Sequence, residues 1–241
     1  QRPKPSVFIN GAHHGNEPMS VEFVYDTIQR LLEHSKEPRI SRWLRTCELW
    51  IFPIINPDGV DAFLEETWRT GRKNERDLDG NGTRERLEGI DLNRNYQFEW
   101  GAPLGATGPL FPGFCYADGP NNDVYNGPVN YEDNDGDGLV NEDHVDGKDD
   151  DADGQVDEDW LGGNSEPETK FIQDMTEMND DNGDGASDFK SSLSWHSYSE
   201  LVLWPWGHCG DGCVTPDDEF LTYHGNLMGQ MTDYDPMQSS D

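Results

Sequence analysis

The chain has 241 residues, which is enough for one domain with a full hydrophobic core. Its 49 acidic residues outnumber its 17 lysines and arginines, and the formal net charge is -32. Such a charge argues against nucleic acids and anionic membranes as partners, and it indicates bound cations. No stretch is long and apolar enough to predict a transmembrane helix. The chain opens at Gln1 without a signal peptide, which is typical of a processed or trimmed form.

The first sixty residues predict a strand, a helix and a second strand. Residues 6–10 form a short apolar run, and apolar residues then repeat at helical spacing from Pro18 to about His34. Residues 49–55 are apolar almost throughout, as in a strand covered on both faces, and residues 56–59 read Asn-Pro-Asp-Gly, a strong turn signal. This order predicts an α/β fold with a mixed, partly parallel sheet flanked by helices.

The middle of the chain lacks clear periodicity from residue 60 to residue 165 and is rich in Gly, Pro, Asn and Asp. A loop of that length is usually functional or separately stabilised. Ser165 and Glu168 have the spacing of a capping box, which predicts a helix start there. Two further strands are expected at residues 192–196 and 201–204, and a last helix at residues 217–231.

The turn after the first strand, residues 11–17, reads Gly-Ala-His-His-Gly-Asn-Glu. Its imidazole at His14 and carboxylate at Glu17 have a spacing that suits one Zn²⁺, with a third ligand expected from another strand end. His196, which closes the strand at residues 192–196, is the best candidate. His13 should point away from its neighbour and not bind the metal. The alternative is a surface turn with a helix-capping glutamate, and the remaining histidines are expected to be structural or exposed: His34, His144, His208 and His224.

Cationic side chains are scarce, yet they cluster in two loop stretches. One contains Arg69, Arg72 and Lys73, and the other contains Asn93 and Arg94. Such clusters indicate an anionic substrate group or a developing oxyanion. The alternative is ion pairing with the acidic loops.

The acidic residues follow a pattern. In four stretches, beginning at residues 77, 133, 149 and 180, oxygen-bearing residues alternate and a glycine takes the sixth position. This arrangement is what a Ca²⁺ loop requires, and it predicts two to four calcium ions, with residues 131–160 as an acidic calcium-binding insertion. The alternatives are a solvated acidic surface, as in a salt-adapted protein, and disorder. The candidate calcium ligands are Asp77, Asp79, Asn81, Thr83, Glu88, Asp133, Asp135, Asp137, Leu139, Asp143, Asp149, Asp151, Asp153, Gln155, Asp159, Asp180, Asn182, Asp184 and Asp188.

The location suggested by these features is a calcium-rich exterior, so the protein is expected to be secreted, periplasmic or on a cell surface. The four cysteines allow two disulfides, with Cys209 pairing locally to Cys213 and Cys47 pairing to Cys115. The alternative is buried free thiols.

Five separated stretches together resemble the zinc metallocarboxypeptidases of the carboxypeptidase A (M14) family. They are residues 11–17, 56–59, 72–74, 91–95 and 196–199, the last leading to Trp-Pro-Trp-Gly at 204–207. The resemblance implies a phosphorylase/hydrolase-like carboxypeptidase fold and one zinc-activated water that hydrolyses the C-terminal peptide bond of peptides or proteins.

Site roles follow from the resemblance position by position. His14, Glu17 and His196 would hold the zinc, and Arg72 would stabilise the oxyanion, in preference to Arg69, because Lys73 and Asn74 follow it. The C-terminal carboxylate of the substrate would be bound by Asn93 and Arg94, and the adjacent subsite would be bordered by Ser197 and Tyr198.

One part of the family pattern is not found. The general-base glutamate and a substrate-capping tyrosine lie late in relatives, and the chain stops at Asp241 before either is expected. The resemblance therefore predicts a single catalytic domain, residues 1–241, that lacks N- and C-terminal parts, with the remainder of its own chain as one partner. Two alternatives stay open: an aspartoacylase- or desuccinylase-like amidohydrolase acting on small acyl amino acids, and a calcium-binding adhesion module with a vestigial zinc site.

Overall fold

The computed structural model describes residues 4–65, 71–76, 82, 89–96, 164–180, 183–207 and 214–239. These residues belong to two compact units. The first draws on Gln1–Asp77, Thr83–Asn93 and Glu166–Ser197, and the second on Leu78–Gly82, Arg94–Ser165 and Tyr198–Asp241. The predicted calcium-binding insertion at residues 131–160 lies outside the described residues. The prediction of a single domain stays a prediction.

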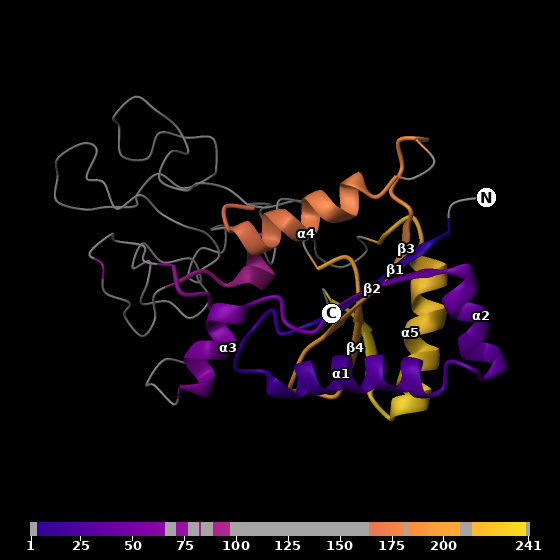
Figure 1. Cartoon of the computed structure of the whole chain (residues 1–241), viewed down its shortest axis with the longest axis horizontal. Coiled ribbons are helices and arrows are strands. Elements are labelled where there is room, and N and C mark those ends of the chain that lie inside the picture. Colours follow the sequence, from indigo (N-terminus) through magenta and orange to yellow (C-terminus); the bar gives the residue numbers. More distant parts are fainter. Residues whose placement is uncertain are drawn as a thin grey trace. The chain divides into compact units, whose positions relative to one another are not determined.

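The first unit is built on a three-stranded parallel sheet (Figure 1). Strand β1 (Ser6–Gly11) lies between β2 (Glu48–Phe52) and β3 (Phe189–Trp195). Gly11, the last residue of β1, is opposite Trp195, the last residue of β3. Because the strands are parallel, the residues that follow β1 and β3 emerge at the same edge of the sheet.

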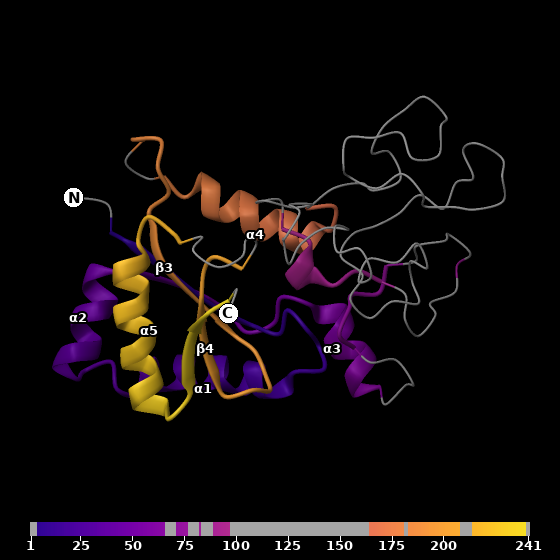
Figure 2. The ribbon, with the colours of Figure 1, turned by 180° about the vertical axis from the view of Figure 1, so that it is seen from behind.

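A helix packs on each face of this sheet. On one face Phe8 contacts Phe52 at a ring-centroid distance of 5.5 Å, and Phe52 contacts Phe171 of helix α4 (Pro167–Met178) at 6.1 Å. On the other face Phe23 of helix α1 (Pro18–Glu33) packs on Trp195 at 5.0 Å. Both views show α1 and α4 on opposite sides of the strands (Figures 1 and 2). The prediction of an α/β fold whose sheet is at least partly parallel and flanked by helices is confirmed.

Two predictions about the second strand are wrong. β2 ends at Phe52 instead of Ile55, and all five of its residues are half-buried instead of fully covered. The backbone still follows β1 beyond the strand, because Ile55 and Asn56 donate hydrogen bonds to the carbonyls of Gly11 and Ala12, at 3.1 and 2.9 Å. All pairings between described strands are parallel, so this part of the chain does not show the predicted mixed sheet.

Two helices differ from the expectations at their starts. Residues 56–59 are not a turn but the beginning of helix α3 (Pro57–Leu64), where the Asn56 side chain accepts a hydrogen bond from the Gly59 amide at 2.8 Å. The Asn-Pro-Asp-Gly sequence suits both uses, since the same side-chain acceptor closes a turn or caps a helix. The capping box predicted for Ser165 and Glu168 at the start of α4 is also wrong, because Glu166 occupies the cap position and its side chain makes no capping bond.

Helix α2 (Pro38–Thr46) packs against β2 and was not predicted. Its apolar residues Ile40, Trp43 and Leu44 have helical spacing, but the helix is only nine residues long and none of its residues is buried, so the sequence signal is short. Cys47, at its end, is half-buried and forms no disulfide with a described residue. Its expected partner Cys115 lies outside the described residues, and so do Cys209 and Cys213.

The second unit contains two parallel strands, β4 (Leu201–Trp204) and β5 (Asp235–Gln238), and helix α5 (Asp218–Thr232). The helix lies close to the strands because it presents glycines to them: a Cβ at Gly225 would lie 2.5 Å from the Trp204 ring. β5 was not predicted, since its four residues contain one proline and two polar side chains. Among the described helices of both units, none has the length and apolar character needed to cross a membrane.

Candidate metal centre

The turn that follows β1 is held by its own residues and by helix α1. Ala12 is fully buried and has a left-handed backbone, with φ of 50°. The Ser20 hydroxyl accepts a hydrogen bond from the Ala12 amide at 2.9 Å and donates one to the Glu17 carbonyl at 2.6 Å. Gly15 packs so closely on the backbone of Gly59 that a Cβ there would overlap it. The turn therefore presents His14 and Glu17 in one fixed arrangement.

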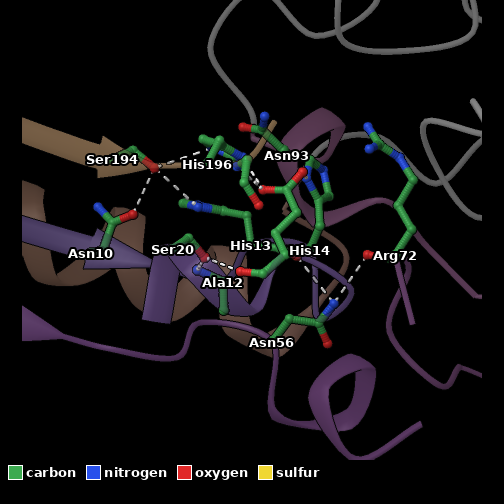
Figure 3. A network of polar contacts seen from close by, with 12 residues as sticks. Asn10, Ala12, His13, His14, Ser20, Asn56, Arg72, Asn93, Ser194 and His196 are labelled. Atoms are coloured by element: carbon green, nitrogen blue, oxygen red, sulfur yellow. Dashed lines mark hydrogen bonds and ion pairs between the residues drawn. The ribbon is translucent and has the colours of Figure 1, made fainter. Parts of the chain in front are cut away.

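His14, Glu17 and His196 form a convergent group at the edge of the sheet. Nδ1 of His14 lies 2.8 Å from one carboxylate oxygen of Glu17, and Nδ1 of His196 lies 2.9 Å from the other. One nitrogen or oxygen atom from each residue lies within 4.8 Å of the others. In the described part of the chain this is the one group of three or more such side chains able to hold a metal ion. Figure 3 shows the two imidazoles, from the ends of β1 and β3, turned toward each other.

Glu17 is not a helix-capping residue, although it occupies the cap position of α1. Its side chain makes no capping bond and instead faces the two histidines, and it also accepts the Ser197 amide at 3.1 Å. Burial opposes ionisation of this carboxyl, but hydrogen bonds from His14 and His196 outweigh it and lower the pKa of Glu17 to about 2. Glu17 is therefore an anion at neutral pH, as a metal ligand must be.

Each of the two histidines has a hydrogen-bond partner on its second nitrogen. Nε2 of His14 lies 3.1 Å from the buried carboxylate of Asp91, and Nε2 of His196 lies 3.3 Å from the hydroxyl of Ser194. The Ser194 hydroxyl donates in turn to the side-chain oxygen of Asn10 at 2.8 Å (Figure 3). These partners can accept a hydrogen bond from a proton on Nε2, which would leave Nδ1 of each ring available to a metal once the Nδ1 proton that faces Glu17 is displaced.

Asp91 connects His14 to an arginine. Its second oxygen accepts hydrogen bonds from Nε of Arg72 at 3.0 Å and from Nη2 at 2.9 Å. Its first oxygen also accepts the Asn93 amide at 3.0 Å, at the start of the 3₁₀ helix η1 (Leu92–Arg94). Burial lowers the pKa of His14, but the hydrogen bonds that the imidazole makes to Asp91 and Glu17 outweigh burial and raise it above 6.5.

The donor set fits zinc. Two imidazole nitrogens and one carboxylate oxygen are the ligands that catalytic zinc sites use, with the fourth position left for water or substrate. The remote nitrogens of both imidazoles already have the acceptors that such ligands require. A proton held between Glu17 and each histidine would be displaced when a metal binds there.

His13, the neighbour of His14, is not part of this group of three side chains. It is buried, and its ring stacks on that of His196 with centroids 5.5 Å apart. Its Nδ1 lies 3.3 Å from the Ser194 hydroxyl. Burial, followed by the proximity of His196 and His14, lowers the pKa of His13 to about 3. His13 is therefore a buried, neutral side chain stacked on the candidate ligand His196.

The other predicted site residues are distributed over both units. Arg72, Asn93 and Ser197 lie in the first unit with the three candidate ligands, whereas Arg94 and Tyr198 lie in the second. Arg69 lies outside the described residues. So do most predicted calcium ligands, namely Asp77, Asp79, Asn81, Thr83, Glu88, Asp133, Asp135, Asp137, Leu139, Asp143, Asp149, Asp151, Asp153, Gln155, Asp159 and Asn182.

The described part of the fourth predicted calcium loop shows its carboxylates bound to its own backbone. Asp180 accepts the amides of Gly183, Asp184 and Gly185 at 2.7, 3.1 and 2.9 Å. Asp188 is buried, and its carbonyl accepts the Ser6 amide at 2.9 Å. Asp180, Asp184 and Asp188 do not form a group of metal-binding side chains among the described residues.

Three site residues were not predicted individually: Asp91, Ser194 and Asn10. Asp91 lies two residues before Asn93 and three before Arg94, which the sequence does identify as candidate substrate-binding residues. The sequence offered only a general indication of such residues, because a histidine that binds a metal through one nitrogen needs a hydrogen-bond acceptor for the other. Which acceptor is used depends on strands and loops that are far apart in the chain.

Comparison with known proteins gives consistent matches. Carboxypeptidase A2 from Rattus norvegicus is 24% identical over 216 residues, which cover 89% of this chain and 38% of that protein. Metallocarboxypeptidase A from Arthroderma otae is 34% identical over 107 residues, which cover 44% of this chain and 24% of that protein. The chain thus spans less than half the length of these relatives.

Two solved structures share the fold. The crystal structure of thrombin activatable fibrinolysis inhibitor (TAFI) aligns with a TM-score of 0.63 at 18% identity, covering 100% of this chain and 50% of that one. Carboxypeptidase A from Helicoverpa armigera aligns with a TM-score of 0.58 at 20% identity, covering 94% of this chain and 41% of that one. The family description "Zinc carboxypeptidase" (Peptidase M14) matches residues 1–234. The chain belongs to the zinc carboxypeptidase family M14.

Proposed function

We propose that the protein is a zinc-dependent carboxypeptidase that hydrolyses the C-terminal peptide bond of peptides or proteins. One observation carries the proposal: His14, Glu17 and His196 converge at the carboxyl edge of a parallel sheet, and Asp91 ties Arg72 to the first of them. Membership of the zinc carboxypeptidase family supports it.

The proposed roles divide between metal binding and substrate binding. When bound, zinc lowers the pKa of a coordinated water to about 7 and polarises the scissile carbonyl. His14, Glu17 and His196 hold the ion, while Asp91 and Ser194 keep the two imidazoles oriented. Arg72 supplies positive charge for the oxyanion. The substrate's C-terminal carboxylate is bound by Asn93 and Arg94, and the adjacent subsite is bordered by Ser197 and Tyr198.

The substrate assignment is tested with matched peptides. Because the chain covers 38% of its rat relative, the assay uses the full-length protein that contains this chain. A peptide with a free C-terminal carboxylate should be cleaved, and the same peptide with a C-terminal amide should not. Equal cleavage of both would refute the carboxypeptidase assignment. Hydrolysis of N-acyl amino acids without hydrolysis of peptides would favour the aspartoacylase-like alternative.

The metal assignment is tested by elemental analysis of two histidine variants. His196→Ala should remove the one zinc ion, because the group loses a ligand. The control is His34→Ala, which removes an exposed imidazole whose Nδ1 lies 2.8 Å from the Glu37 carboxylate. This control should retain zinc. A protein that contains calcium and no zinc would favour the adhesion-module alternative.

We also propose two to four calcium ions in the acidic loops and a calcium-rich exterior as the working environment. The support is the fourfold alternation of oxygen-bearing residues with a glycine at the sixth position. His196→Ala should leave the calcium content unchanged. A protein that contains no calcium after dialysis against 1 mM calcium, roughly the upper end of Kd for extracellular modules, would exclude the calcium loops.

A further inference from the structure

The Asn56 side chain connects the backbone of the turn that carries His14 and Glu17 to the backbone at Arg72. It is fully buried, at 0% exposure. Its side-chain NH₂ group donates to the carbonyl of His13 at 3.1 Å and to the carbonyl of Arg72 at 3.3 Å, as Figure 3 shows. Its side-chain oxygen accepts the Gly59 amide at 2.8 Å. One amide group thus joins three chain segments.

The contact with His13 bears directly on the candidate ligand His14. The His13 carbonyl belongs to the peptide bond between His13 and His14, so holding it fixes the orientation of the backbone from which the His14 ring projects. The backbone amide of Asn56 adds a second connection, to the Ala12 carbonyl at 2.9 Å. The turn is therefore anchored on Asn56 at two successive carbonyls.

The contact with Arg72 closes a loop of interactions. The side chains of Arg72 and His14 both reach the Asp91 carboxylate. Their backbones both reach Asn56, directly for Arg72 and through His13 for His14. Two independent connections, one on each side, therefore set the distance between the candidate metal ligand and the guanidinium.

We propose that Asn56 is a positioning residue that holds His14 and Arg72 in register through their backbones. The inference deepens the proposed function and rests on it for the roles of His14 and Arg72. A helix cap alone would need only the side-chain oxygen, since the cap bond goes to Gly59. The two donated bonds are additional, and they are what the test removes.

The first test measures zinc affinity in two variants of the full-length protein. Asn56→Ser keeps an oxygen that can cap α3 and removes the NH₂ group that donates to the His13 and Arg72 carbonyls. Ala62→Gly is the matched control, because it weakens the same helix without changing a side-chain hydrogen bond. Zinc affinity is measured by chelator competition at a temperature below the unfolding midpoints of both variants. Asn56→Ser should bind zinc about 10-fold more weakly than the wild type, which is the lower end of the loss seen when a residue that orients a metal ligand is changed. Equal affinities in Asn56→Ser and Ala62→Gly would overturn the proposal.

The second test needs no zinc and separates this inference from the proposed function. In metal-free protein, the unfolding free energies of Asn56→Ser, Asp91→Asn and the double variant form a cycle. If both residues hold the same two segments, the double variant should lose less than the sum of the single losses. Strict additivity would overturn the positioning role. Failure of the wild type to bind zinc would instead refute the proposed function, and the cycle would still test whether Asn56 and Asp91 hold the same two segments.

Discussion

Asp91→Asn should weaken zinc binding sharply while leaving the fold in place. The Asp91 carboxylate is 1% exposed and accepts hydrogen bonds from His14, from Arg72 and from the Asn93 amide. Asparagine has nearly the same shape but replaces one acceptor oxygen with a donor group. That group faces either the imidazole N–H or the guanidinium N–H atoms, so one of these two contacts is lost.

The size of the effect follows from the position of Asp91 behind a metal ligand. Loss of such a partner typically reduces metal affinity by about 10- to 100-fold, which corresponds to about 1.4–2.7 kcal/mol. The assay is competition for zinc with a chelator of known affinity at pH 7.5. Asp26→Asn is the control, because it makes the same chemical change in an exposed carboxylate that pairs with Arg30 at 2.6 Å.

The pH dependence gives the reasoning a second check. In the metal-free protein the hydrogen bond to Asp91 contributes to raising the pKa of His14 above 6.5. A proton on His14 competes with zinc, so wild-type affinity should begin to fall as the pH drops below that raised pKa. In Asp91→Asn the pKa of His14 is lower, and the fall should begin at lower pH. Equal zinc affinities for Asp91→Asn and Asp26→Asn at pH 7.5 would refute the orienting role of Asp91.

Three further outcomes are expected. Ser194→Ala should weaken zinc binding by about 10-fold through loss of the His196 contact, whereas Ser192→Ala, two residues earlier on the same strand, should not. Chelator competition measures both zinc affinities, and equal values would contradict an orienting role of Ser194. Gly15→Ala should abolish zinc binding or lower the unfolding midpoint, measured by calorimetry, because its Cβ overlaps a neighbouring backbone; an unchanged variant would contradict that packing. Burial raises the pKa of Glu168 above 4.5 against a backbone hydrogen bond that lowers it, with smaller contributions from the carboxylates of Glu166 and Asp58, so its ionised form destabilises the fold at pH 7. Glu168→Gln should therefore raise the unfolding midpoint at pH 7 and lose this advantage below pH 4.5, where the carboxyl is protonated in both states; no gain at pH 7 would contradict the assignment.

The sequence by itself determined those features that depend on local order along the chain. The spacing of His14 and Glu17 in one turn identified two candidate ligands, because residues three apart on a tight turn share one side. His196 was found in the same way, since it closes a predicted strand. The apolar period of α1 and its proline start were also readable, as both arise from interactions within one helix.

Tertiary structure alone decided which partners hold these ligands. Asp91 reaches His14 across 77 residues of sequence, and Ser194 reaches Asn10 across 184. Hydrogen bonds between such distant residues leave no period or spacing to detect. Residues 56–59 make the same point, because an Asn oxygen that accepts a nearby amide suits a turn and a helix cap equally. Only packing against the His13 and Arg72 carbonyls gave Asn56 its position between the metal-binding turn and the arginine.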